Sequence, residues 1–147
     1  MSSVVQPPSQ ADTEALLDFI RKSDQPVVPD KAFLLPTLPE LLNRHMGKAD
    51  ISTDTLFELI GMNRSTGYRI LNGQRRPSRD VLLALSLALG LNYQEAQNLL
   101  KVGRMAQLTP RNNRDFLILF AVMHGHSLGD TDDLLVRQGH NALLSGE

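Results

Sequence analysis

Five arginines lie close together within residues 61–79, in a chain of 147 residues whose formal net charge is only -1. The segment reads GMNRSTGYRILNGQRRPSR and contains no acidic residue, so its formal charge is +5. An arginine guanidinium binds phosphate and the edge of guanine through paired N–H donors. This local excess of positive charge predicts contact with a polyanion, and the alternative is an ordinary solvated surface.

The residues around the arginines predict two helices joined by a tight turn. Ser52 is a favoured N-cap for the first helix, which Gly61 ends. Asn63 is the N-cap of the second helix, and Asn72-Gly73 terminates it. A helix, a short turn with glycine and a second helix with basic residues outside are the plan of a helix-turn-helix.

The segment STDTLFELIGMNRSTGYRILNGQRRPS resembles the lambda-repressor-like, Cro-type helix-turn-helix family, also called the xenobiotic-response-element family. The matching positions are Leu56, Ile60-Gly61, Asn63, Ile70, Asn72-Gly73 and Pro77-Ser78. The resemblance implies a five-helix domain over residues 38–108 and binding of double-stranded DNA, with the helix at 63–72 in the major groove.

Two positions depart from that family. Thr53 stands where the family usually has a glutamine that clamps a phosphate, which implies a weaker or different clamp. Gly67 stands where the family usually buries Ile or Val, and glycine inside a helix costs about 0.5 to 1 kcal/mol relative to alanine. The recognition helix is therefore expected to be either looser than usual or packed unusually close to its neighbour.

Helix-turn-helix geometry assigns roles to the polar residues of this region. The N-terminal part of a recognition helix reaches base edges, so the predicted base contacts are Arg64, Ser65 and Arg69. Groups that flank the helix contact phosphates. The predicted phosphate contacts are Thr53, Asn63, Thr66, Tyr68, Gln74, Arg75, Arg76 and Arg79.

Helical patterns dominate the remaining chain and predict an all-α fold. Residues 1–37 form an N-terminal extension with a disordered start, one short helix that places Ala15, Leu16, Phe19 and Ile20 on one face, and a Pro-rich linker. Within 38–108, further helices are expected from Pro39 to near Gly47, from Pro77-Ser78 through Leu89, and after Asn92, which forms a capping box with Glu95.

Residues 109–147 predict a C-terminal helical hairpin. Thr109-Pro110 would open its first helix, and Ser127 with Asp130 would form a capping box for the second. A shift of 35 residues aligns Arg79-Asp80 with Arg114-Asp115, Gly90 with Gly125, and Leu99-Leu100 with Leu134-Leu135. The hairpin is either a degenerate copy of the preceding helix pair, which would add a helical layer or a self-association surface, or a chance likeness.

Composition excludes several classes of protein. Cysteine is absent, which excludes disulfides and thiolate chemistry, and the longest apolar run, VLLALSLALGL, is shorter than the roughly 20 residues needed to cross a bilayer. The N-terminus lacks the pattern of a signal peptide. These features predict a cytoplasmic protein that is not bound to a membrane.

Enzymatic and metal sites have weak support in the sequence. No glycine-rich phosphate loop or recognisable pair of catalytic carboxylates is present, so no enzyme activity and no cofactor are expected. His124 and His126 lie near Asp130, Asp132 and Asp133, but helix-end electrostatics explain this pattern better than a metal does.

The sequence therefore predicts a sequence-specific, DNA-binding transcriptional regulator, with repression and activation both open. A homodimer is expected because one recognition helix covers only a few base pairs. Its interface would involve residues 109–147 or the N-terminal extension. The alternative is a protein-interaction module of helix-turn-helix fold, either an adaptor or an antitoxin-like partner, with a protein partner bound through residues 109–147.

Overall fold

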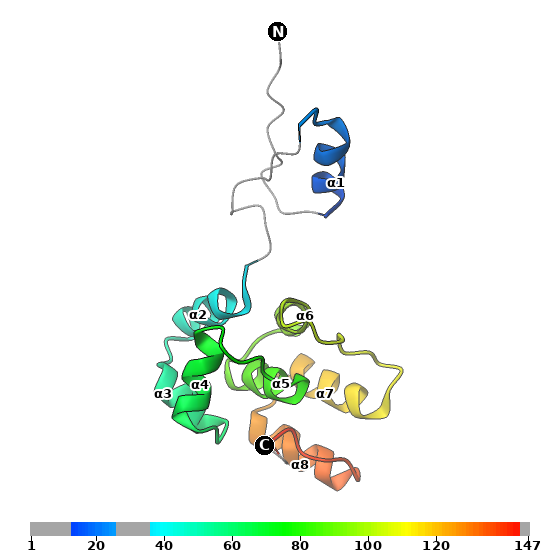
Figure 1. The fold of residues 1–147 in the computed structure, drawn as a ribbon. Coiled ribbons are helices and arrows are strands. Elements are labelled where there is room, and N and C mark those ends of the chain that lie inside the picture. Colours follow the sequence, from blue (N-terminus) through cyan, green and yellow to red (C-terminus); the bar gives the residue numbers. More distant parts are fainter. Residues whose placement is uncertain (1–12, 26–35, 145–147) are drawn as a thin grey trace. The chain divides into compact units, whose positions relative to one another are not determined.

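The computed structural model describes residues 13–25 and 36–144, which contain eight helices and no strand (Figure 1). The predicted all-α fold class is confirmed. Contacts divide the chain into two compact units, Met1–Pro36 and Thr37–Glu147. We call the second the main unit.

The first unit contains helix α1, Thr13–Lys22, which buries none of its residues. Ala15, Leu16 and Phe19 are half-buried, whereas Ile20 is 65% exposed. The predicted disordered start and most of the predicted Pro-rich linker lie outside the described residues.

Helix α2, Leu38–Ala49, begins one residue before the predicted start and ends two residues beyond Gly47. Its N-cap is Thr37, whose side chain accepts a hydrogen bond from the Glu40 amide while the Glu40 carboxylate accepts one from the Thr37 amide. This capping box satisfies amides that have no partner within the helix and sets the start of the helix.

Helices α3, Thr53–Leu59, and α4, Arg64–Leu71, form the predicted helix-turn-helix. The predicted N-caps are confirmed, since Ser52 accepts from the Thr55 amide at 3.2 Å and Asn63 accepts from the Ser65 amide at 2.8 Å. Gly61 has a φ of +68° in the turn between the helices, a conformation that favours glycine.

Helices α5, Arg79–Ala88, and α6, Tyr93–Val102, follow the predicted caps. Ser78 caps α5, and Asn92 with Glu95 forms the predicted capping box at α6. Nearly the whole of α5 is buried, including Leu82, Leu83 and Leu85, so this helix forms the centre of the core.

Helices α7, Asn113–Met123, and α8, Leu128–Arg137, form the predicted C-terminal hairpin. The predicted start at Thr109-Pro110 was wrong, because the Asn112 side chain caps α7 by accepting from the Asp115 amide. Ser127 caps α8 by accepting from the Asp130 amide. The predicted capping box there is reduced to this one bond, as the Asp130 side chain is one methylene shorter than the glutamate of a full box.

The structure supports the 35-residue repeat. Gly90 and Gly125 share left-handed φ angles of +68° and +67°. Two hydrogen bonds further along the chain also match. The Gln97 side chain accepts from the Leu108 amide at 2.8 Å, and Asp132 accepts from the Leu143 amide at 2.7 Å. Each partner in the first contact is 35 residues before its counterpart in the second.

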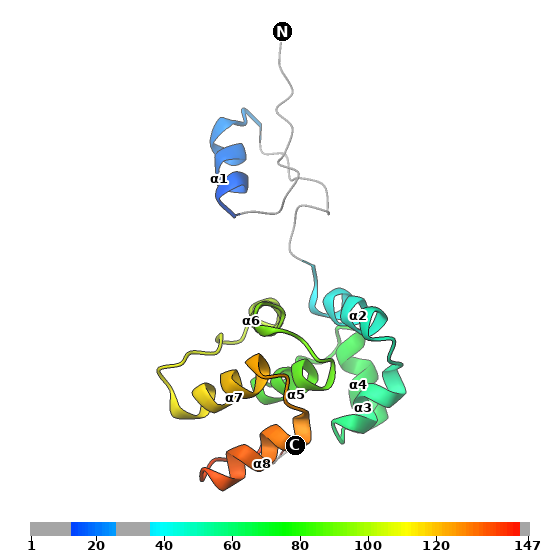
Figure 2. The ribbon, with the colours of Figure 1, turned by 180° about the vertical axis from the view of Figure 1, so that it is seen from behind.

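The two hairpins pack in a reciprocal manner. Helix α5 contacts α8 and α6 contacts α7, so that an exchange of the two repeats leaves the set of contacts unchanged. Figures 1 and 2 show α5 and α7 in the middle of this arrangement, with α6 on one side and α8 on the other. The α5–α6 and α7–α8 hairpins thus pack with approximate two-fold symmetry.

Candidate nucleic-acid interface

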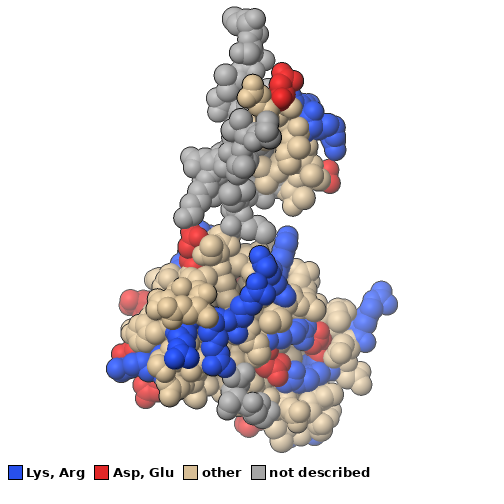
Figure 3. Space-filling model, viewed as in Figure 1, with Lys and Arg blue, Asp and Glu red and all other residues tan. Residues whose placement is uncertain are grey.

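The predicted recognition helix presents basic side chains to solvent. Arg64 and Arg69 are exposed on α4, and Arg75 and Arg76 are exposed in the segment that follows it. Figure 3 shows Lys and Arg side chains gathered on the face of the main unit that carries α4 and α5. The structure therefore brings four of the five clustered arginines to the surface around one helix.

The N-terminus of α4 is held by Asn63. Its Oδ1 accepts hydrogen bonds from both the amide and the hydroxyl of Ser65, at 2.8 and 2.9 Å. Ser65 and Arg69 are four residues apart and share one stripe of the helix, and Arg64 and Tyr68 share the neighbouring stripe. The three predicted base-contacting residues therefore occupy two adjacent stripes of α4.

Asp54, in the first turn of α3, contacts the second of these stripes. One carboxylate oxygen lies 3.1 Å from Arg64 Nη2, and the other accepts from the Tyr68 hydroxyl at 3.2 Å. The sequence did not indicate Asp54 as part of the site. Its position directly after Thr53, which the family resemblance places beside the recognition helix, is the signal that would have identified it.

The close approach of α3 and α4 explains Gly67. A Cβ atom added to Gly67 would lie 2.5 Å from Cγ of Phe57, and this ring is buried in the core. Of the two expectations for this position, the structure supports unusually close packing. The absence of a side chain on α4 makes room for the aromatic ring of α3.

The remaining predicted phosphate contacts differ in exposure. Gln74 is exposed, whereas Thr53 and Thr66 are half-buried. Thr53 lines a small open pocket between α3 and α4, together with Asp54, Arg64 and Tyr68. The structure thus brings three of the predicted residues, Thr53, Arg64 and Tyr68, together around Asp54.

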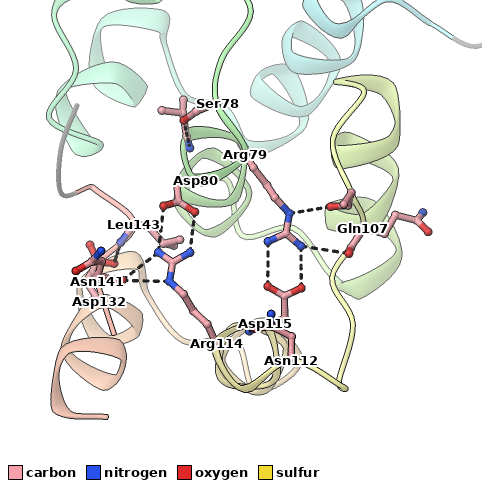
Figure 4. Close-up of polar contacts among 12 residues, drawn as sticks. Ser78, Arg79, Asp80, Gln107, Asn112, Arg114, Asp115, Asp132, Asn141 and Leu143 are labelled. Carbon is pink, nitrogen blue, oxygen red and sulfur yellow. Dashed lines mark hydrogen bonds and ion pairs between the residues drawn. The ribbon is translucent and has the colours of Figure 1, made fainter. Parts of the chain in front are cut away.

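Arg79 differs from the other arginines of the cluster, because its guanidinium is engaged within the protein (Figure 4). Nη1 and Nη2 donate to the two carboxylate oxygens of Asp115 at 2.9 and 2.8 Å. Nε and Nη2 also donate to the carbonyl oxygens of Ala106 and Gln107. Arg79 was predicted to contact a DNA phosphate. In the structure its donors bind Asp115, Ala106 and Gln107 instead, so we leave Arg79 out of the interface.

The pKa shifts of Arg79 and Asp115 support an ion pair between them. Burial alone would raise the pKa of Asp115, but hydrogen bonds from Arg79 and the Thr109 amide, with the charges of Arg79 and Arg114, lower it below its ordinary value of 3.8. The hydrogen bond to Asp115 likewise raises the pKa of Arg79. Both groups are therefore charged at neutral pH and neutralise each other.

A second ion pair is the counterpart of the first in the repeat (Figure 4). Arg114 donates to both carboxylate oxygens of Asp80, at 2.9 and 3.1 Å, and to the carbonyl oxygen of Asn141. Arg79-Asp80 at the start of α5 and Arg114-Asp115 at the start of α7 thus pair crosswise. The sequence repeat had aligned the two dipeptides, but alignment alone did not indicate their contact.

The C-terminal histidines take part in ring contacts. The His124 ring stacks on Phe120 with a centroid distance of 4.1 Å, and His126 meets Phe120 edge-on at 5.6 Å. Within residues 13–25 and 36–144, no group of three or more His, Asp or Glu side chains is arranged to hold a metal ion. No helix in this part of the chain is long and apolar enough to span a membrane.

Comparison with known proteins gives one match. Residues 42–98 match the family model described as Cro/C1-type HTH DNA-binding domain. No curated protein and no solved structure matches the chain. The matched region runs from the middle of α2 through most of α6 and includes all of α3 and α4. It supports a Cro-type helix-turn-helix protein that binds double-stranded DNA and acts in transcription regulation.

Proposed function

We propose that this protein is a sequence-specific transcriptional regulator that reads the major groove of DNA with α4. Arg64, Ser65 and Arg69 contact base edges in this proposal. The phosphate contacts come from Thr53, Asn63, Thr66, Tyr68, Gln74, Arg75 and Arg76. The observation that carries the proposal is the exposed basic surface of α4 within the region that matches the DNA-binding family.

Asp54 has a part in this proposal that the sequence did not suggest. It holds Arg64 and Tyr68 beside α3, which reduces the number of conformations that Arg64 samples before binding. The ion pair engages Nη2 of Arg64, and in this proposal the remaining donors of Arg64 bind a base edge. An arginine oriented in this way suits a forked contact with guanine O6 and N7.

Three finer features of the proposal rest on the sequence. The proposal takes the protein to be a member of the lambda-repressor-like, Cro-type family that is also called the xenobiotic-response-element family, which its sequence resembles. A cytoplasmic homodimer would bind two half-sites one helical turn apart. The segments 1–37, 38–108 and 109–147 would act as extension, DNA-binding domain and added hairpin.

The alternative is a protein-interaction module that retains the helix-turn-helix fold. The observation in its favour is the exposed apolar surface of α7, which lies outside the family match. DNA recognition requires the basic surface of α4, whereas the protein-interaction module does not. A substitution on α4 therefore distinguishes the two functions.

The test removes two arginines from α4. We expect the Arg64→Ala, Arg69→Ala double variant to lose most of its preference for a sequence selected from a random DNA pool, since each forked contact provides about 1 to 3 kcal/mol of discrimination. The control is Arg21→Ala, Arg111→Ala, which removes the same charge from exposed positions outside the family match. Binding is measured by fluorescence anisotropy and folding by circular dichroism.

The salt dependence of binding gives a second result from the same experiment. With three to four phosphates neutralised, a plot of log K against log salt concentration has a slope of about -3 to -4, from roughly -0.9 per phosphate. Binding of a folded double variant with unchanged affinity and sequence preference would refute the role of α4 and favour the protein-interaction module.

A further inference from the structure

Part of the hairpin α7–α8 is apolar but exposed. Phe116, Phe120 and Met123 are 55%, 44% and 66% exposed on α7, and Val136 on α8 is 60% exposed. The α7 residues are spaced by four and three positions, so they form one stripe of the helix. We call these four residues the outer apolar face.

The internal repeat shows what such a stripe does in the first hairpin. Phe116 and Phe120 correspond to Val81 and Leu85 of α5, which are 1% and 0% exposed. Helix α5 is buried because it also packs against α3 of the helix-turn-helix. The described residues contain no counterpart of α2–α4 on the α7 side, so no other helix covers the equivalent stripe of α7, where only Phe120 meets the rings of His124 and His126.

The surroundings of this stripe carry both signs of charge. An open groove between α7 and α8 is lined by Phe120 and Val136 together with Asp130, Asp133 and Arg137. In a contact between identical copies around a two-fold axis, each patch meets itself, so that Arg137 of one copy can approach the aspartates of the other. A partner of a single charge sign would leave part of this rim unmatched.

We infer that the outer apolar face is the interface through which two copies of this chain form a dimer. The two copies meet α7 against α7 around a two-fold axis, with the aromatic side chains of each packed against the other. This inference rests on the proposed function, because it names the surface that forms the proposed homodimer. The helices α3 and α4 remain free to bind DNA.

The mass of the full chain in solution tests the inference. One chain has a mass of 16.3 kDa, and we expect light scattering of the wild-type protein to give twice this value. The Phe116→Glu, Phe120→Glu variant should give the mass of one chain with an unchanged circular dichroism spectrum, because both side chains are exposed. The control Tyr93→Glu, at a residue that is 42% exposed on α6, should remain a dimer.

A charge exchange tests the two-fold geometry. Asp133→Lys and Arg137→Glu should each weaken the dimer, and the double variant should restore it, because each side chain then meets its new opposite charge in the other copy. Equal weakening in the single and double variants would overturn the self-complementary contact.

The outcomes separate this inference from the proposed function. A wild-type protein that stays monomeric would overturn the dimer and its interface together. A dimer that survives Phe116→Glu, Phe120→Glu would overturn only the interface. Neither outcome bears on recognition by α4, which is measured with the Arg64→Ala, Arg69→Ala variant on a single half-site.

Discussion

Gly67 of α4 packs directly against the Phe57 ring of α3. The ring of Phe57 fills the volume that a side chain at position 67 would need. A helix without Cβ at this point loses some intrinsic stability, but the aromatic ring gains a large buried contact area. The pair therefore fixes the distance between the two helices of the helix-turn-helix.

We predict that the effect of Gly67→Ala changes sign with residue 57. In the wild-type background the added methyl overlaps Phe57, and the free energy of unfolding falls by about 1 to 2 kcal/mol, within the range for overpacked cores. In a Phe57→Ala background the same substitution fills a cavity and raises the free energy of unfolding. Urea denaturation measures both values.

Gly47 provides the matched control for this prediction. It also lies within a helix, α2, but apart from its chain neighbours and the nearby backbone of its own helix, no atom lies within 4 Å of a Cβ added there. Gly47→Ala should therefore stabilise the protein by about 0.5 to 1 kcal/mol. A stabilising Gly67→Ala in the wild-type background would contradict the tight packing.

At the scale of elements, two crossed ion pairs join the starts of α5 and α7. Each arginine forms paired hydrogen bonds with the aspartate of the other helix and also donates to at least one backbone carbonyl. Asp115 is the most buried of the four side chains, at 6% exposed, and Asp80 is the least, at 34%. The pair at Asp115 is therefore expected to contribute more to the packing of the two hairpins.

We predict that Asp115→Ala lowers the free energy of unfolding by roughly 3 kcal/mol, because it leaves the Arg79 charge without its partner in a partly buried site. Asp80→Ala should cost less, since its pair is better exposed to solvent. A double-mutant cycle with Arg79→Ala isolates the coupling between Arg79 and Asp115. The prediction fails if this coupling is no larger than experimental error in urea denaturation.

The whole molecule should be less stable in acid. Two groups, His45 and Asp115, set the pH ranges over which stability is lost. His45 on α2 is 6% exposed and its Nε2 has no hydrogen-bond partner among the described residues. Burial lowers the pKa of His45 below its ordinary value of 6.5, and the carboxylate of Glu95 offsets this only in part. The unfolded chain then binds a proton at this site more readily than the folded protein does.

We predict that the free energy of unfolding decreases as pH falls below about 6.5, because protons favour the unfolded state through His45. A second decrease follows below pH 3.8, the ordinary pKa of the Asp115 carboxyl, which the folded state lowers. Thermal denaturation from pH 7 to pH 3 measures both. In His45→Leu the first decrease should disappear, and its persistence would exclude His45 as the cause.

The start sites of most helices and the helix-turn-helix could be predicted from local sequence patterns. The caps at Ser52, Asn63, Ser78 and Asn92 involve residues within one helical turn, so their types and spacing predicted where these helices begin. The cluster of arginines and the glycine turn likewise predicted the helix-turn-helix that the family match supports. The caps at Thr37 and Asn112 were not predicted, because the nearby Pro39 and Pro110 were taken as the starts of these helices.

Which side chains are available to bind a partner depends on the folded structure. A count of charges does not distinguish a free arginine from one paired with a residue 36 positions away, as Arg79 is with Asp115. The reason for Gly67 likewise depends on the position of the Phe57 ring on another helix. The exposure of Phe116 and Phe120, whose repeat counterparts are buried, depends on what packs against each hairpin. These properties arise from contacts between distant segments, which local sequence patterns do not contain.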